Sequence, residues 1–227
     1  MTVKSDLIRG VLVSAVLFPV FAYGGEPSGI GGPTLVQIYN NENMKALAVE
    51  KGRRVYMEEC AECHGEDGTG TTGVPDFTTG IWLWGGSLSD IEITVRYGIR
   101  SGHSLQRFSE MPAYLGTDLL TKQDIDDLTE YVLSISEKEA DKQAVARARE
   151  KFEIICSECH DYDGKGRMEY YGAPDLTDYY WLYGESRDAI YGSMAEGRSG
   201  VSPAFEDKLD NEAIKAVTIY VYSISHY

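Results

Sequence analysis

The stretch CAECH at residues 60–64 recurs as CSECH at residues 156–160, and the two copies contain all four cysteines of the chain. Cys-x-x-Cys-His is the attachment signature of c-type haem. Thiols three positions apart lie on one side of a helical turn, where each can add to one vinyl group of the same porphyrin. The histidine that follows can then ligate the iron. The sequence therefore predicts two covalently attached haems c, bound through Cys60, Cys63, Cys156 and Cys159, with His64 and His160 as iron ligands.

Two cysteine pairs are also compatible with disulfides or with a zinc site. A histidine directly after the second cysteine is not the spacing of a common zinc module, and the internal repeat described below separates the two pairs. We therefore favour haem over both alternatives.

The chain is acidic, with a formal net charge of −15 over 227 residues. Its apolar and charged fractions are those of a soluble globular protein. Such a charge argues against nucleic acid as a partner. It suits a redox protein partner with a basic docking surface. Acidity that merely keeps the protein soluble is the alternative interpretation.

The N-terminal residues 1–24 have the pattern of an export signal. Lys4 and Arg9 form a short basic region, and the apolar run 11–22 that follows is shorter than the ~20 residues that span a membrane. We expect export to the periplasm, with an uncleaved anchor as the alternative. Residues 25–43 are rich in Gly, Pro and Asn and are predicted to form an irregular arm.

Text outside the pentapeptides also repeats. A shift of 96 positions places Cys60 on Cys156, and a shift of 99 places PDFT at 75–78 on PDLT at 174–177. The changing offset indicates small insertions and deletions in loops. The chain therefore contains two homologous units.

Each unit ends in a predicted helix. A shift of 89 places LTKQDIDDLTEYVLSIS on LDNEAIKAVTIYVYSIS, and the helices begin after the capping residues Thr121 and Asp210. We predict an all-α fold of two tandem class I cytochrome c domains, residues 44–136 and 137–227, each wrapped around its haem. Ser136 with Glu139 resembles a capping box that opens the second unit.

The sixth iron ligand differs between the units. In the first, Met111 precedes Pro112 in a loop about fifty residues after His64, and a thioether there would raise the haem potential. A shift of 91 places Met111 on Ser202, and a serine hydroxyl is a poor ligand for ferrous iron. We therefore predict His/Met ligation for the first haem and an atypical second haem.

The second iron has several alternatives for its sixth position. It is five-coordinate or water-bound, it takes a ligand from a partner chain, or it is capped by another side chain of this chain. For each such side chain a surface or core role is the alternative. These residues are Met194, His226, Met168 and His103.

The amino-acid sequence resembles tandem class I cytochromes c, and most of all the diheme cytochrome c subunit of C-family (cbb-type) cytochrome c oxidases. The similarity rests on GAPDLTDYYWLYG at 172–184, EGRSGVSPAF at 196–205, and the matching first-unit text PDFTTGIWLWGG and MPAY. It covers nearly all of the chain from about residue 44.

The resemblance implies that the first and last helices of each unit cross. The implied contacts are those of Gly52 and Tyr56 with Tyr131, and of Ala148 and Phe152 with Tyr220. It also implies that two proline carbonyls orient the haem histidines and that two arginines pair with propionates, with solvated surface charges as the alternative. Two tryptophans would wall the haem pockets. These pairs are Pro75 and Pro174, Arg100 and Arg198, and Trp82 and Trp181.

The chain departs from this family in two ways. Family members carry membrane-spanning helices before the haem domains and a methionine where Ser202 stands. These departures favour a periplasmic relative that is soluble or peripherally associated with a membrane respiratory complex.

The resulting functional hypothesis is an electron carrier between respiratory or dehydrogenase partners, rather than an enzyme. The first alternative is a haem enzyme or ligand-binding protein that uses an open iron at the second haem for peroxide, a gas or a sulfur anion. The second is a haem subunit whose ligand comes from a partner.

Overall fold

The computed structural model describes residues 32–226, so the predicted export signal and residues 25–31 of the predicted arm lie outside the described residues. The described part of the arm is not irregular as predicted, because Thr34 caps a short helix over residues 35–39 and a long helix begins at Glu42. Regular secondary structure in this range is helical, accompanied by isolated β-bridges, which agrees with the predicted all-α class. The elements are α1 (Leu35–Tyr39), α2 (Glu42–Glu59), α3 (Ala61–His64), η1 (Phe77–Thr79), α4 (Leu88–Tyr97), α5 (Lys122–Ile135), α6 (Lys142–Lys151), η2 (Phe152–Cys156), α7 (Ser157–His160), α8 (Met168–Tyr171), α9 (Arg187–Glu196) and α10 (Asn211–Ile224).

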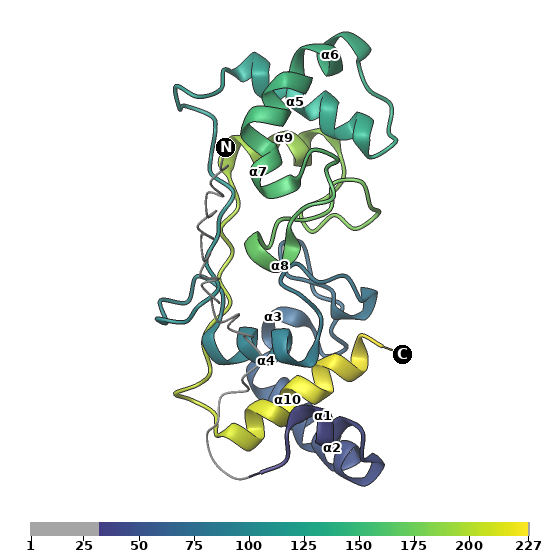
Figure 1. Cartoon of the computed structure of the whole chain (residues 1–227), viewed down its shortest axis with the longest axis vertical. Helices are drawn as coiled ribbons and strands as arrows, with labels where there is room; N and C mark the ends of the chain where they lie inside the picture. Colours follow the sequence, from purple (N-terminus) through teal and green to yellow (C-terminus); the bar gives the residue numbers. More distant parts are fainter. Residues whose placement is uncertain (1–31, 227) are drawn as a thin grey trace, which may run out of the picture. The chain divides into compact units, whose positions relative to one another are not determined.

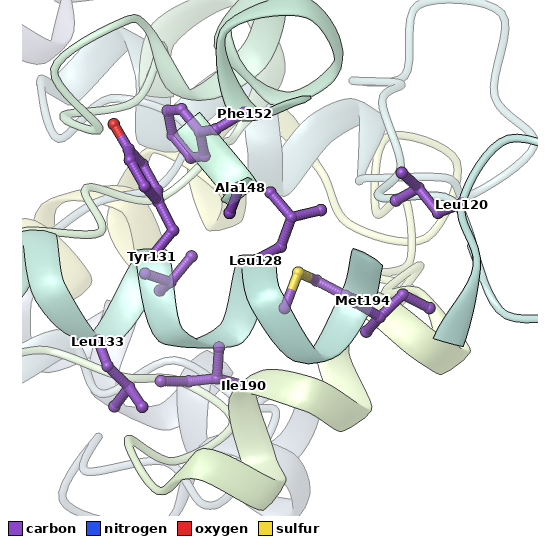
Figure 2. Close-up of a cluster of buried hydrophobic side chains, with 10 residues drawn as sticks. Leu120, Leu128, Tyr131, Leu133, Ala148, Phe152, Ile190 and Met194 are labelled. Carbon is purple, nitrogen blue, oxygen red and sulfur yellow. The ribbon is translucent and has the colours of Figure 1, made fainter. Parts of the chain in front are cut away.

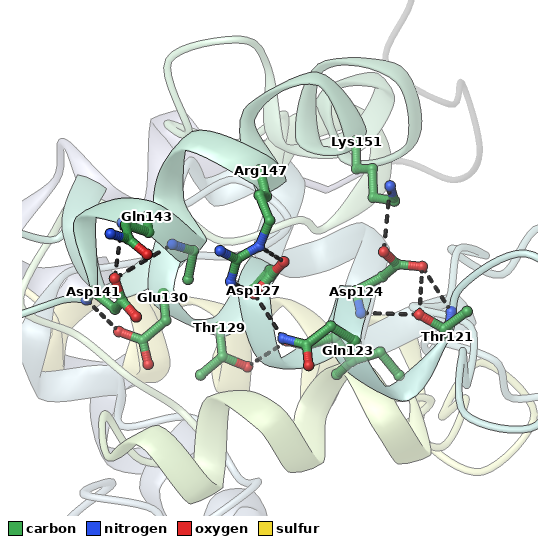
Figure 3. Close-up of polar contacts among 12 residues, drawn as sticks. Thr121, Gln123, Asp124, Asp127, Thr129, Glu130, Asp141, Gln143, Arg147 and Lys151 are labelled. Atoms are coloured by element: carbon green, nitrogen blue, oxygen red, sulfur yellow. Dashed lines mark hydrogen bonds and ion pairs between the residues drawn. The ribbon is translucent and has the colours of Figure 1, made fainter.

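N-capping side chains mark where several helices begin. Thr121 and Asp210 cap α5 and α10 as predicted, each accepting a hydrogen bond from a main-chain N–H of the first turn. The predicted start at Ser136 is wrong, because this residue ends α5 and Asp141 caps α6 instead. Figure 3 shows these caps at Thr121 and Asp141.

One core forms around the first pentapeptide from α2, α4 and α10. Tyr56 is fully buried, and its ring lies 5.2 Å from that of Tyr220 on α10. Gly52 allows this crossing, because a Cβ at that position would lie 2.1 Å from the carbonyl oxygen of Ala216. We call α2, α3, α4 and α10 the His64 unit.

A second core forms around the other pentapeptide from α5, α6 and α9. Leu128 of α5 is buried with Ile190 and Met194 of α9, and the ring of Tyr131 lies 4.7 Å from that of Phe152 (Figure 2). Across the outer face, Arg147 donates two hydrogen bonds to the buried carboxylate of Asp127, at 2.6 and 2.7 Å (Figure 3). We call α5, α6, α7 and α9 the His160 unit.

The two units have therefore exchanged their final helices. The helix that ends the first repeat, α5, packs on α6 and α9, while the helix that ends the second repeat, α10, packs on α2 and α4 (Figure 1). The expected contacts of Tyr56 with Tyr131 and of Phe152 with Tyr220 are thus wrong in their pairing. The repeats are contiguous in the sequence, but the packed units are not.

The side chains of α5 and α10 explain why each helix packs in the unit of the other repeat. Glu130 of α5 forms an ion pair with Arg187 of α9, whereas Ile219, its equivalent in α10, is fully buried against Leu35 and Ile38 of α1. In an arrangement without exchange, the Glu130 carboxylate would lie against the apolar side chains of α1. Burying an unpaired carboxylate costs several kcal/mol.

Two segments connect the units: the one between α4 and α5, and the one between α9 and α10. They form main-chain hydrogen bonds with each other where they cross. Ile99 and Ser202 exchange two main-chain hydrogen bonds of 2.9 and 3.0 Å, and Met111 and Arg198 exchange two of 3.0 and 2.8 Å. Ile99 is equivalent to Arg198 under the shift of 99, and Met111 to Ser202 under the shift of 91. The crossing therefore has an approximate two-fold relation.

Candidate haem-binding sites

The first pentapeptide ends one long helix and begins a single helical turn. Cys60 is the final cap of α2 and precedes α3, which ends at His64. The hydroxyl of Tyr56 donates to the carbonyl of Gly65 at 2.7 Å and fixes the start of the following loop. That loop returns to His64, whose Nδ1 lies 3.3 Å from the carbonyl oxygen of Pro75.

The second pentapeptide has the same local arrangement. Nδ1 of His160 lies 3.2 Å from the carbonyl oxygen of Pro174. Gly166 permits the close return of this loop, because its φ is +77° and a Cβ would lie 2.4 Å from the carbonyl oxygen of Ala173. A carbonyl oxygen can only accept, so Nδ1 carries the proton in each ring and Nε2 keeps the lone pair that a metal needs.

Burial gives both imidazoles the protonation state of a metal ligand. Desolvation lowers the pKa of His64 and of His160 below the usual histidine value, against the opposing effect of their proline carbonyls. Both rings are therefore neutral at pH 7. Phe77 stacks on the His64 ring, with 4.3 Å between centroids.

A largely apolar cavity is lined by residues of both pentapeptides. Its walls include the cysteines and histidine of each motif, together with Met111, Ser202 and the aromatic residues of both loops. Among the described buried side chains, Nε1 of Trp82, Nε1 of Trp181 and Nε of Arg198 lack a hydrogen-bond partner. An apolar ring with carboxylate substituents fits this set of apolar walls and unpaired donors. The residues present thus suit a haem at each motif.

The two arginines of the sequence prediction both line this cavity. Arg100 donates from Nε to the carbonyl of Gly200 at 2.6 Å and also contacts the carbonyl of Ser109. Arg198 donates to the carbonyl of Gly197 at 2.8 Å, and its guanidinium lies 4.4 Å from the ring centre of Tyr183.

Two models of known families match the chain. Cytochrome c matches residues 49–136, and cytochrome c oxidase, cbb3-type, subunit III matches residues 143–221. The cbb3-type cytochrome c oxidase subunit FixP of Bradyrhizobium diazoefficiens is 38% identical over 202 residues, which cover 88% of this chain and 69% of the relative. The corresponding subunit CcoP of Azospirillum sp. is 33% identical, covering 87% of this chain and 69% of the relative. CcoP of Rhodobacter capsulatus is 31% identical, covering 98% and 87%.

The chain belongs to the FixP/CcoP family of cbb3-type cytochrome c oxidase subunits. Like its FixP/CcoP relatives it is a diheme cytochrome c with two covalently attached haems and an electron-transfer role in a respiratory chain. No helix among residues 32–226 is both long and apolar enough to cross a membrane.

Within this FixP/CcoP chain, Met111 packs in a different unit from His64, the histidine with which the sequence predicted it to share a haem. Met111 is partly buried against the core of the His160 unit, against which Cys156 and Trp181 also pack, and it is not among the residues packed against the core of the His64 unit. Burial raises the pKa of the nearby Tyr114 to about 12, with smaller contributions from the cysteines of the second motif. The exchange of α5 and α10 carries Met111 to the second site and Ser202 to the first.

The other sixth-ligand candidates divide into two groups. Met194 lines the cavity from α9 and is buried in the His160 unit. The remaining three do not line this cavity. Met168 begins α8. His103 stacks on Tyr97, and its Nε2 lies 3.3 Å from Oε2 of Glu206. His226 stacks on Tyr222.

The sequence reading missed the residues that join the two sites. Tyr183 of the second loop packs on Gly73 of the first, and Trp84 of the first packs on Gly172 of the second. A shift of 99 places Trp84 on Tyr183 and Gly73 on Gly172. This repeat of an aromatic residue and a glycine was the sequence signal that could have indicated the two contacts. Main-chain and side-chain hydrogen bonds reinforce them, from Gly73 N–H to the Leu182 carbonyl and from Asp76 N–H to the Tyr180 hydroxyl, both 2.9 Å.

Proposed function

We propose that this chain transfers electrons between its two haem sites on the periplasmic side of a cbb3-type oxidase or a related respiratory complex. When bound, each haem supplies an iron that takes up and releases one electron. The observation that carries the proposal is the direct contact between the two loops, through Trp84 on Gly172 and Tyr183 on Gly73. Through these contacts the loop of one site packs directly on the loop of the other.

His160 and Met111 are the proposed axial ligands of the second haem. The packing of Met111 against the same core as Cys156 and Trp181 supports this pairing, as does the main-chain pairing of Met111 with Arg198. A thioether ligand raises the haem potential. We expect the His160 site to have the higher potential of the two.

We propose that other cavity residues orient the two haem histidines or neutralise the charge of the haem propionates. The Pro75 and Pro174 carbonyls hold the two imidazoles, and the unpaired donors of Trp82, Trp181 and Arg198 are proposed to bind propionates. The net charge of −15 suits a redox partner with a basic docking surface.

Replacing Met111 by leucine tests the ligand assignment. We expect the Met111→Leu variant to lose the red absorption band that is characteristic of methionine-ligated ferric haem, and one haem to become high-spin. Met194→Leu is the matched control, because it alters a buried methionine of the same core and nearly conserves volume. A band that survives in Met111→Leu but disappears in Met194→Leu would contradict the assignment.

A rapid-mixing measurement tests the transfer itself. A reductant that reacts with one haem should reduce the second within the same protein molecule, at a rate that is independent of protein concentration. Reduction of the second haem only at a rate proportional to concentration would contradict direct transfer between the two sites.

A further inference from the structure

Ser202 occupies the place in the His64 unit that Met111 occupies in the His160 unit. Ser202 pairs with Ile99 as Met111 pairs with Arg198, and three residues later Phe205 donates to Val95 as Tyr114 donates to Met194, at 3.1 and 3.0 Å. Both Ser202 and Met111 line the cavity. The same main-chain geometry therefore presents a thioether to one site and a hydroxyl to the other.

Among the described residues, the cavity wall of the His64 unit has no imidazole or thioether besides His64. The two methionines of α2 do not line the cavity: Met57 is partly buried against the core of the His64 unit, and Met44 packs against the cluster around α1. His103 is the nearest remaining imidazole by sequence to this crossing, and both of its ring nitrogens are engaged, by Glu206 and by the Leu105 N–H.

We propose that Ser202 leaves the sixth position of the first haem, the one at His64, open to an external small ligand. The inference rests on the proposed function, since it assumes His64 as the fifth ligand. It also moves the open site from the second haem, where the repeat alone placed it, to the first. The ligand class is small neutral diatomic molecules in the ferrous state, with water in the ferric state.

The surroundings of Ser202 support this class of ligand. The cavity wall of this unit includes the apolar side chains of Ile91, Val95 and Phe205. The one cation that lines the cavity beside this segment, Arg100, already donates to the main-chain carbonyls of Gly200 and Ser109. Ser202 itself is only half-buried, and among the described residues its hydrogen bonds are the two main-chain ones with Ile99. A small uncharged molecule can therefore reach this wall and meet the Ser202 hydroxyl beside largely apolar side chains.

Carbon monoxide titration of the full-length diheme protein tests the proposal. With both haems reduced by dithionite, we expect CO to bind one haem of the two, and the oxidised protein to show one high-spin and one low-spin haem by electron paramagnetic resonance. Two low-spin haems that do not bind CO would overturn the proposal, and would point to a cap such as His103.

Three variants assign the site. Ser202→Met should weaken CO binding at least tenfold and make the second ferric signal low-spin, while Ser199→Met, in the same segment but outside the cavity wall, should keep CO binding unchanged. Met111→Ser should add a second CO-binding haem. CO binding that persists in Ser202→Met and disappears in a variant of the His160 site would overturn the assignment.

The outcomes separate this inference from the proposed function. If the methionine band depends on Met111 but the wild-type protein binds no CO, only the open site is wrong. If CO binds one haem in the expected way but the band ignores Met111, the ligand assignment at His160 is wrong. The wild-type titration decides the open site even if Ser202→Met fails to fold.

Discussion

The exchange of α5 and α10 can be tested with the aromatic pairs that it creates. Tyr56 contacts Tyr220 at 5.2 Å between ring centroids, and it has no contact with Tyr131, which lies in the other core. The perturbation is a double-mutant cycle that replaces Tyr56 and Tyr220 by leucine, singly and together. A second cycle replaces Tyr56 and Tyr131.

The structure sets the expected magnitudes. Tyr56 is fully buried and Tyr220 is 8% exposed, so each single replacement should lower the free energy of unfolding by about 1–3 kcal/mol. The lost hydrogen bond from Tyr56 to Gly65 enters every Tyr56 variant and cancels in the cycle. An aromatic pair adds about 0.5–1.5 kcal/mol beyond area burial. The Tyr56/Tyr220 cycle should show this coupling, and the Tyr56/Tyr131 cycle should be additive within about 0.5 kcal/mol.

Urea unfolding of the holoprotein, followed by circular dichroism and by haem absorbance, measures these energies. Equal m-values among the variants establish that they are compared on the same transition. Coupling between Tyr56 and Tyr131, with additivity between Tyr56 and Tyr220, would refute the exchanged arrangement and restore two contiguous domains.

Two further predictions concern single positions. Gly52→Ala should destabilise the protein by about 1–3 kcal/mol, because the new Cβ would lie 2.1 Å from a main-chain oxygen of α10. The control is Gly192→Ala, whose Cβ would meet nothing closer than 3.8 Å and which should stabilise the protein by about 0.5–1 kcal/mol. Destabilisation at both positions would contradict the packing argument. Hydrogen bonds from Arg147 lower the pKa of Asp127, so this carboxylate contributes stability above its unfolded pKa of about 4, and that stability is lost as the pH falls through the lower folded value. Asp127→Asn should therefore flatten the acid side of the stability curve below about pH 4, which denaturation at a series of pH values will measure, while the exposed Asp126→Asn should leave its shape unchanged.

The sequence by itself determined the chemistry that depends on neighbouring residues. The Cys-x-x-Cys-His motifs specify both attachment points within one helical turn, and the family follows from text on either side of them. The caps at Thr121 and Asp210 were also predictable, because a side chain that accepts from the first helical turn needs only a few consecutive residues. The loops that return Pro75 and Pro174 to the histidines are similarly short.

Only the tertiary structure decided which final helix completes which haem site. The helices α5 and α10 have nearly the same apolar pattern, so periodicity assigns each to either unit equally well. The distinction lies in long-range contacts: Glu130 meets Arg187 in one unit, while Ile219 meets apolar side chains of α1 in the other. Because the segments that lead to these helices carry Met111 and Ser202, the same choice places Met111 in the His160 unit and Ser202 beside α4 of the His64 unit.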